Sequence, residues 1–513
     1  MKNIRVMLAM IAVLVFVCAI SVSGQGPQAL PGSGWWTSFQ IQNVDPSEQA
    51  TIVYTAYWIE DSGHDETYEQ LGEILIDPNS SVIYNPCLDP NYPSGNRVGF
   101  DPDLPDGFAG AVQISADRPV YAVVSVGNNT TGDCPGEAGG KASAFYQGTT
   151  GEAVADLISF PVMKHNYYGQ TTSFYIQAAG EDATIDATFM SGADTWPITG
   201  VSIDAGKTYL LDPAAAGVPD GTLGVLVVEA TSGEIAGAVI EHAHAGAPAA
   251  FALATRGFGP NDADVKVVAP TNKLDYWGGN TGWQLQNTTA VTATMNVTFT
   301  VTGVQPGSDA DTAGIAENDE FVVENVSIPP DGSYLFSKGK GTYQEALRTT
   351  DDILLASGVF FAGVAVSDQP LVATVNESSG AGKIMYAAFG ANNATTKIAL
   401  PLVKEMFYGQ TTATTVQNVG TAPTDVTLTY VGNKGTFDVG PYTLGPGKAM
   451  NFFKLCDDTR WSTLYGVGDQ PECEANNAVS IVSTAEPIVA VAQESSLTTG
   501  ALDVKNYEGF NLE

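Results

Sequence analysis

Basic residues are scarce in this chain. Only 21 Lys and Arg side chains stand against 56 Asp and Glu, so the formal net charge at pH 7 is −35 over 513 residues. No run of basic residues is long enough to hold a phosphate backbone, and an anionic lipid surface would repel so acidic a chain. Nucleic acids and anionic membrane surfaces are therefore excluded as partners.

Long apolar runs are equally scarce, and the clearest one lies at the start of the chain. Lys2 and Arg5 precede an apolar stretch over residues 6–20, and small residues follow at positions 21–24. This pattern is typical of a secretory signal peptide, and the stretch is shorter than the roughly 20 residues of a transmembrane helix. We expect residues 1–24 to be removed on export, which lowers the net charge by two further units and leaves no integral membrane segment.

Export places the mature protein outside the cell or on its surface. A lipid anchor at Cys18 is the alternative, but the residue before it is the bulky Val17, whereas such cleavage sites favour a small residue. The sequence therefore predicts a secreted or cell-surface protein and does not identify its anchor.

Cysteine is also rare, with five residues in the chain and four after removal of the signal peptide. An even number in an exported chain indicates disulfides. Proximity in sequence favours pairing Cys87 with Cys134 and Cys456 with Cys473. A zinc site is the alternative, but the close C-x-x-C spacing and a neighbouring histidine are both missing.

Catalytic motifs are missing as well. The chain contains no H-E-x-x-H, G-x-S-x-G, phosphate-binding loop or dinucleotide fingerprint, and it has only four histidines. Carboxylate pairs such as Asp351 and Asp352 are adjacent, so that in a strand they point to opposite faces. We therefore predict that the protein is not an enzyme.

What the chain does contain is an internal repeat. Residues 160–172 (FPVMKHNYYGQTT) recur at residues 400–412 (LPLVKEMFYGQTT), and a third copy begins at residue 269 and a shortened fourth at residue 31. A glutamine follows at a fixed distance in each copy: Gln42, Gln177, Gln286 and Gln417. Repetition at this period indicates one supersecondary unit used four times.

A second repeated signature reads as strand, turn, strand. Residues 110–124, 362–375 and 478–491 each place an acidic residue and a proline between two alternating apolar runs, and residues 231–234 supply the turn in the remaining copy. Short alternating strands with frequent turns over roughly 110 to 130 residues are typical of a β-sandwich. The sequence predicts an all-β protein of four tandem antiparallel sandwich modules, arranged as a string: residues 25–150, 151–260, 261–394 and 395–513.

In repeat layout and composition the chain resembles the tandem immunoglobulin-like, adhesion-type surface proteins of bacteria and archaea. That resemblance implies immunoglobulin-like modules and a structural or adhesive role at a cell surface, without fixing a ligand.

Metal binding has three candidate sites. His242 and His244 are two apart, so that in a strand they share a face, but the equivalent repeats keep only the neighbouring glutamate. Two acidic loops offer oxygen ligands for calcium, the one cofactor that we consider, although neither has an EF-hand layout. Their candidate ligands are Asp101, Asp103, Asp106, Asp309 and Asp311. Solvated acidic turns are the simpler interpretation of these loops.

Each repeat carries an adjacent aromatic pair: Trp35/Trp36, Tyr167/Tyr168, Tyr276/Trp277 and Phe407/Tyr408. Neighbours in a strand face opposite sides, so we expect one ring of each pair in the core and the other at the surface or against the next module. The second rings are candidate platforms for stacking against sugars: Trp36, Tyr168, Trp277 and Tyr408.

Eight Asn-x-Ser/Thr sequons offer glycosylation sites on an exported chain. They are Asn79, Asn128, Asn129, Asn287, Asn296, Asn325, Asn376 and Asn393.

These observations favour a non-catalytic, secreted or cell-surface structural or adhesive protein that self-associates or binds a cell-surface glycan or protein. The alternative is an array of extracellular glycan-binding modules. Binding to glycans supports the second hypothesis, and ordered self-assembly supports the first.

Overall fold

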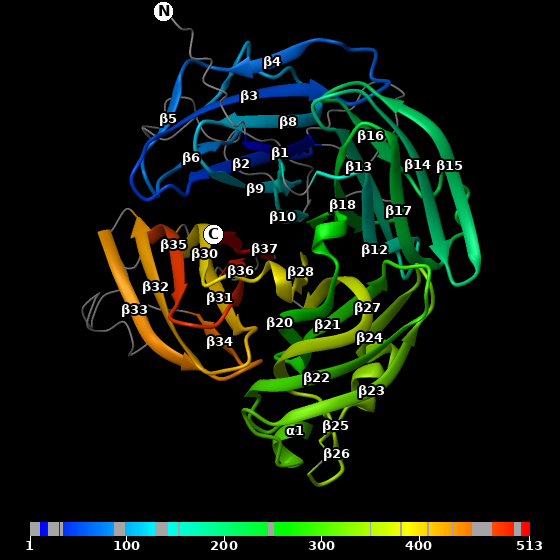
Figure 1. The fold of residues 1–513 in the computed structure, drawn as a ribbon, viewed down its shortest axis with the longest axis vertical. Coiled ribbons are helices and arrows are strands. Elements are labelled where there is room, and N and C mark those ends of the chain that lie inside the picture. Colours follow the sequence, from blue (N-terminus) through cyan, green and yellow to red (C-terminus); the bar gives the residue numbers. More distant parts are fainter. Residues whose placement is uncertain are drawn as a thin grey trace, which may run out of the picture.

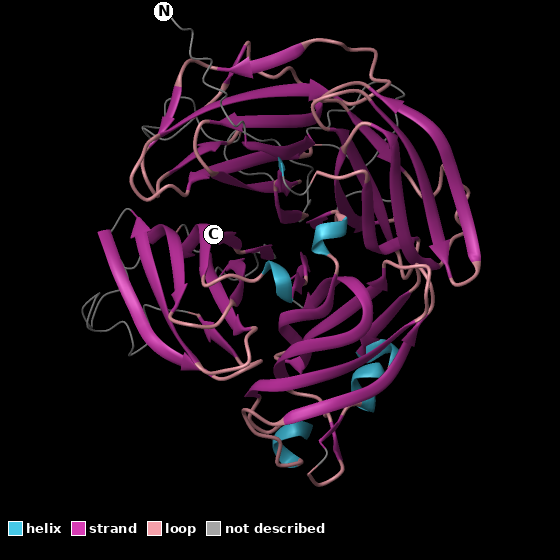
Figure 2. Cartoon of the chain, viewed as in Figure 1, coloured by secondary structure: helices cyan, strands magenta, loops and turns pink. Residues whose placement is uncertain are grey.

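The computed structural model describes residues 11–18, 30, 34–86, 98–128, 142–151, 154–244, 251–348, 350–379, 382–407, 410–432, 435–453, 475–496 and 504–512. Strands dominate this part of the chain, and its one α-helix is the short α1 (Asp309–Thr312) (Figure 2). The named strands pair antiparallel throughout. The predicted all-β class is confirmed.

The sheets follow one another along the chain in four sets, which we call groups 1 to 4 (residues 11–150, 157–256, 264–390 and 397–512). Group 1 has a seven-stranded sheet, β11-β1-β8-β3-β4-β7 with β5 on β3, and a four-stranded sheet, β10-β9-β2-β6. Its strands are β1 (Ile11–Cys18), β2 (Trp36–Asn43), β3 (Ala50–Trp58), β4 (Thr67–Gln70), β5 (Ile74–Ile76), β6 (Ser81–Tyr84), β7 (Phe100–Asp101), β8 (Ala109–Ala116), β9 (Val120–Gly127), β10 (Ser143–Gln147) and β11 (Thr149–Thr150).

Group 2 has two four-stranded sheets, β12-β17-β14-β15 and β16-β13-β18-β19, whose facing sides share one apolar core. Its strands are β12 (Leu157–His165), β13 (Gln170–Ala178), β14 (Ala183–Ser191), β15 (Asp194–Ile203), β16 (Thr208–Leu211), β17 (Thr222–Ser232), β18 (Ile235–Ala243) and β19 (Ala252–Arg256).

Group 3 is one ten-stranded sheet, because the long β27 pairs with strands on both sides of the group. Its strands are β20 (Asp264–Tyr276), β21 (Gly279–Asn287), β22 (Ala293–Val304), β23 (Glu320–Ile328), β24 (Ser333–Ser337), β25 (Leu347–Arg348), β26 (Ile353–Leu354), β27 (Val359–Ser379), β28 (Gly382–Ala387) and β29 (Phe389–Gly390). Short 3₁₀ turns lie at Pro260–Asp262, Lys338–Lys340, Thr342–Glu345 and Ala391–Asn393.

Group 4 returns to two sheets, β33-β32-β35-β30-β38 and β34-β31-β36-β37. Its strands are β30 (Lys397–Glu405), β31 (Gln410–Asn418), β32 (Thr424–Gly432), β33 (Gly435–Leu444), β34 (Ala449–Phe452), β35 (Ala475–Ser483), β36 (Ile488–Ser496), β37 (Val504–Glu508) and β38 (Phe510–Leu512).

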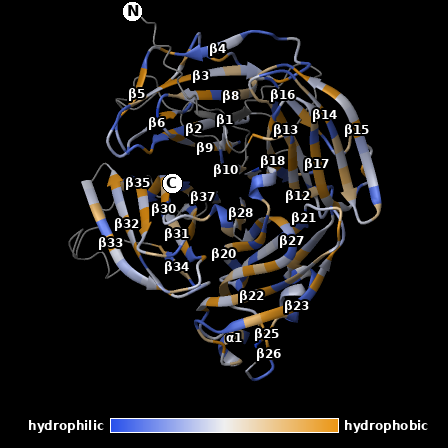
Figure 3. Cartoon of the chain, viewed as in Figure 1, coloured by the Kyte–Doolittle hydropathy of each residue, from blue (hydrophilic) through white to orange (hydrophobic). Residues whose placement is uncertain are grey.

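Inner and outer strands differ in burial. The outer strand β14 alternates buried and partly exposed positions, as expected for a sheet with one face in water (Figure 3). The inner strands β2 and β13 are buried at nearly every position. Both faces of an inner strand are covered, one by the facing sheet of its own group and the other by a neighbouring group.

The four groups form a ring around a central axis (Figure 1). The strands β10, β19, β28 and β37 each contact the equivalent strand on either side. The ring closes between groups 1 and 4, where Tyr121 Oη donates to Asn511 O at 2.8 Å and Gln147 Nε2 donates to Glu508 O at 2.7 Å. This closed arrangement differs from the linear string expected from the sequence, because the apolar inner faces are buried against each other.

The repeated glutamine makes the same contact in groups 2 and 4. Gln177 and Gln417 lie at the same place in β13 and β31. Each side-chain amide donates to a carbonyl of the turn before the strand that pairs with it, β16 or β34: Gly206 O at 2.8 Å and Gly447 O at 3.1 Å. The fully buried side chain fixes that turn against the inner strand.

Buried ion pairs repeat in the same way. Lys164–Glu241, Lys273–Glu377 and Lys404–Glu494 join the first strand of groups 2, 3 and 4 to an inner strand, with N–O distances of 2.8, 2.6 and 2.9 Å. The repeated lysine and the repeated glutamate of the sequence are therefore two halves of one contact.

Phe145 of β10 lies at the contact between groups 1 and 4 that closes the ring of groups. Its ring packs into the core of group 4, with 6.1 Å between the centroids of the Phe145 and Tyr507 rings. Lys505 Nζ lies 5.0 Å from the centroid of the Phe145 ring. We expect Phe145→Ala to cost about 3–5 kcal/mol and to raise the radius of gyration in small-angle scattering, because it removes the apolar contact that closes the ring. Phe174→Ala, within the group 2 core, is the matched control and should lower stability without expanding the particle.

Glu508 lies near the axis with 3% of its surface exposed, and burial raises the pKa of its carboxyl above the usual range. The stability that this group contributes is full below its unfolded pKa and is lost as pH rises through the higher folded pKa. Glu508→Gln should therefore gain thermal stability over the wild type from pH 4 to pH 8, measured by calorimetry. Glu66→Gln, at an exposed site, should show no such gain.

Candidate ligand-binding cleft

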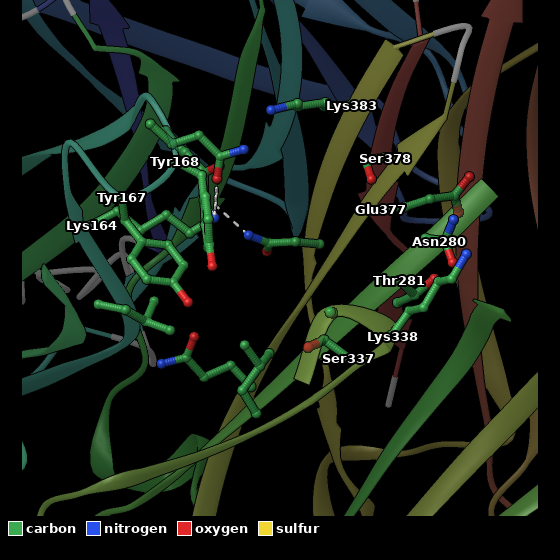
Figure 4. Close-up of a pocket in the computed structure, with 18 of the residues that line it drawn as sticks. Lys164, Tyr167, Tyr168, Asn280, Thr281, Ser337, Lys338, Glu377, Ser378 and Lys383 are labelled. Atoms are coloured by element: carbon green, nitrogen blue, oxygen red, sulfur yellow. Dashed lines mark hydrogen bonds and ion pairs between the residues drawn. The ribbon is translucent and has the colours of Figure 1, made fainter. Parts of the chain in front are cut away.

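A cleft of about 330 Å³ lies between groups 2 and 3. One wall carries Lys164, Tyr167 and Tyr168 from the region of β12, and the opposite wall carries residues of β21, β24 and β27 with the 3₁₀ turn Lys338–Lys340 (Figure 4). Both walls are built on strands of the ring, so the cleft is preformed by the packing of the two groups.

A tight hairpin presents Tyr168 to the cleft. The backbone groups of Tyr167 and Gln170 bond to each other at 2.9 and 3.1 Å, and the two residues between them have positive φ, 50° at Tyr168 and 74° at Gly169. Glycine adopts this conformation easily, whereas a bulky tyrosine is strained there. Tyr168 is 87% exposed, so its own packing does not explain the strain.

The same turn places Trp277 in group 3, with φ of 51° and 70% of its surface exposed. Its backbone N–H donates to Gln305 Oε1 at 2.7 Å, and its side chain does not line the cleft. Trp277 is therefore an internal comparison for Tyr168, with the same local geometry outside the cleft.

The cleft is also where basic residues gather. Lys164, Lys338, Lys340 and Lys383 are four of the 21 Lys and Arg residues in the chain. Glu241 pairs with Lys164, and Asp275 pairs with Lys338 at 2.7 Å. Lys340 and Lys383 make no ion pair with any residue that the structure describes. Two positive charges therefore remain to attract an anion in an otherwise acidic molecule.

Lys383 sits partly inside the wall. Its Nζ lies 3.8 Å from the centroid of the Phe251 ring, and burial lowers the pKa of its ammonium group below the usual range. The cation is held by the aromatic face, with no carboxylate as an ion-pair partner among the described residues. An anionic group entering the cleft would restore the charge balance that burial disturbs.

The four residues predicted to stack against sugars differ in exposure. Tyr168 and Trp277 are exposed and remain candidate platforms, and Tyr408 lies outside the described residues. Trp36 is 9% exposed, with its ring packed against Gly127, so this prediction is wrong: the ring is part of the fold and cannot stack on a ligand.

The metal candidates gain no support from the geometry. Among the described residues, no three His, Cys, Asp or Glu side chains are grouped as a metal site would require. Asp309 and Asp311 lie in the first turn of α1, where Asp311 Oδ2 accepts from Gly307 N at 2.7 Å. Asp101, Asp103 and Asp106 are exposed around β7.

His242 of β18 and His244, directly after this strand, are also engaged within the protein. His242 Nε2 lies 2.9 Å from Ser173 Oγ, and His244 Nδ1 lies 2.7 Å from Thr171 Oγ1. Burial lowers the pKa of His242, because it disfavours the charged form of the ring. Hydrogen bonding to an adjacent strand accounts for the pair.

The sequons differ in access. Asn79, Asn296 and Asn325 are exposed, and Asn376 and Asn393 are partly buried. Asn128 and Asn287 are fully buried, and Asn287 Nδ2 donates to Val291 O at 2.6 Å, so neither amide is open to a glycan in the folded protein. Asn129 lies outside the described residues, as do Cys87, Cys134, Cys456 and Cys473 with their predicted disulfides.

No protein-family model matches the chain, and no curated protein is significantly similar to it. Within the described residues, every helix is too short or too polar to cross a bilayer.

The sequence alone did not point to Lys338, Lys340 and Lys383. A signal was present, because Lys338-Gly-Lys340 places two lysines close together in a chain poor in basic residues. Their meeting with Tyr168 depends on how groups 2 and 3 pack, and local sequence does not encode that packing.

The strain at Tyr168 gives a stability test. Tyr168→Gly should raise the free energy of unfolding by about 1 kcal/mol, because glycine relieves the cost of a positive φ. Tyr168→Ala retains a Cβ and should give no comparable gain. Denaturant unfolding of both variants measures the difference, and equal stabilities would show that the turn is not strained.

Proposed function

We propose that the chain is an exported, non-catalytic adhesive protein of the cell surface, built from four tandem immunoglobulin-like sandwich modules that correspond to groups 1 to 4. The cleft between the second and third modules binds an acidic glycan. The observation that carries this proposal is the meeting of the exposed, strained Tyr168 with the uncompensated Lys340 and Lys383.

The chemistry of the cleft suits a sugar that carries carboxylate or sulfate groups. An exposed tyrosine offers an apolar face on which a sugar ring can stack. Lysines give charge-assisted hydrogen bonds to anionic oxygens, and these bonds are about twice as strong as neutral ones. In a molecule with a net charge of −35, most of the surface repels an acidic ligand. The cleft is therefore the place where such a ligand would bind.

Repeated contacts at equivalent positions support the assignment of groups 2 to 4 to one repeated unit. The buried Lys–Glu pair recurs in groups 2, 3 and 4, and the glutamine that binds the turn recurs in groups 2 and 4. An adhesive role agrees with a rigid ring that presents a preformed cleft.

Calorimetric titration of the full chain with an oligomer of galacturonic acid, and with a neutral galactose oligomer, tests the ligand class. We expect only the acidic oligomer to bind, and we expect its affinity to fall as salt is added. Lys340→Ala combined with Lys383→Met should weaken binding about tenfold or more, which is the value of one lost charge-assisted bond.

Matched controls lie outside the cleft. Trp277→Ala and Lys397→Ala should bind as the wild type does, whereas Tyr168→Ala should bind weakly. Equal binding of both oligomers, or full binding by the cleft variants, would refute the proposal.

A further inference from the structure

The first strand of each group occupies an equivalent place in its sheet. In group 2, β12 pairs with β17 so that Met163 lies opposite Gly224, and in group 1, β1 pairs with β8 so that Val17 lies opposite Gly110. The two glycines mark the same close approach, because a Cβ on either would lie within 2 Å of a carbonyl oxygen of the strand on the other side. β8 therefore holds the place in group 1 that β17 holds in group 2, and β1 holds the place of β12.

The strand that fills this place in group 1 differs from its equivalents. Cys18 lies opposite Ala109 where Lys164 lies opposite Leu223, so the lysine of the buried pair is missing. Its partner is missing too, because Thr37 faces Val126 where Thr172 faces Glu241. Group 1 thus presents an apolar position to this strand where the other groups present a carboxylate.

The connection to the next strand also differs. Residues 166–169 join β12 to β13 in a tight turn, whereas residues 19–35 separate β1 from β2. The residues of β1 lie within the predicted signal peptide, residues 1–24. After cleavage, residues 25–30 (QGPQAL) would be the nearest replacement, but glycine and proline make that sequence a poor strand.

We propose that export leaves the edge of β8, between β8 and β11, as an acceptor groove for an extended apolar strand of a partner protein. This interaction surface is separate from the glycan cleft and goes beyond the proposed adhesive function. Val112 and Ile114 of β8 pair with positions 15 and 13 of β1, Val124 and Val126 belong to β9, which also contacts β1, and all four side chains are fully buried when β1 is in place. An unpaired strand edge over such a core binds a donor strand through main-chain hydrogen bonds and alternate side chains.

The chemistry of the donor follows from the strand that fits. Its sequence, IAVLVFVC, is eight residues long, uncharged and rich in β-branched residues, and it runs antiparallel to β8 with every residue in register. A second copy of the mature chain is a poor donor, because its comparable apolar runs are already paired in β27 and β36. A partner with a free segment of this kind is the occupant that fits.

The first measurement is the mass of the exported protein. We expect its N-terminus to follow the predicted signal peptide, near residue 25. A chain that retains residues 11–18 fills the groove with its own strand and overturns the proposal.

The second measurement is hydrogen exchange of the exported protein with a synthetic peptide. The probe is the sequence of residues 11–18 with Cys18→Ser and two flanking lysines for solubility. At 100 times its Kd the peptide should slow exchange of the β8 amides roughly 100-fold, because it binds only the folded chain. The same peptide with Val15→Pro cannot complete the ladder and should have no effect.

Three other outcomes of these measurements would contradict the binding of a partner strand. Protection of β8 before any peptide is added, or no change on adding it, would show that the groove is closed in the mature chain. A dimer in light scattering that the peptide dissociates would make a second copy the occupant and overturn the partner assignment. Binding of the acidic oligosaccharide should be the same with and without peptide, so that failure here is distinguishable from failure of the proposed function.

Discussion

Burial of the inner strands on both faces is the constraint on which the rest of the molecule depends. Strands such as β13 and β31 have a sandwich core on one side and a neighbouring group on the other, and almost none of their positions reaches water. A sheet of this kind is stable only if something covers its second face. Closing the four groups into a ring provides that cover for each of them without a partner chain.

Double burial also explains the unusual polarity of these strands. Thr, Gln and Ser occupy fully buried positions of β13, β21 and β31, where a purely apolar interior would be simpler. Each polar group that has a partner fixes a strand, a turn or a neighbouring group in one register, as Gln284 does when its amide donates to Gly224 O across the groups 2 and 3 boundary at 3.3 Å. The buried Lys–Glu pairs add specificity more than stability, because removing two charges from water offsets much of their attraction.

The sequence predicted the all-β class because the alternation within a strand is local, and its repeats marked residues that make equivalent contacts in the structure. Period-two alternation in segments such as residues 425–431 indicates a half-buried strand, and the repeated glutamine, as Gln177, binds the turn between β15 and β16. The ring could not be predicted, since a strand buried on both faces loses the alternation that would reveal it. The same double burial affects Trp36: the sequence predicts one ring of each aromatic pair in the core and the other at the surface or against the next module, and here Trp35 and Trp36 are both buried. The lysines of the cleft are distant in sequence from Tyr168, so only the packing of groups 2 and 3 brings them together.

A ring that closes on itself also restricts how such a protein can evolve. A linear array of sandwich units gains or loses a unit at little cost, because its terminal units leave no apolar face uncovered. Here the strands β10, β19, β28 and β37 each contact the equivalent strand on either side, so every group has two neighbours. Duplication or loss of one group would leave an apolar inner face with no neighbour, so the copy number is fixed by geometry while the outer loops remain free to diverge.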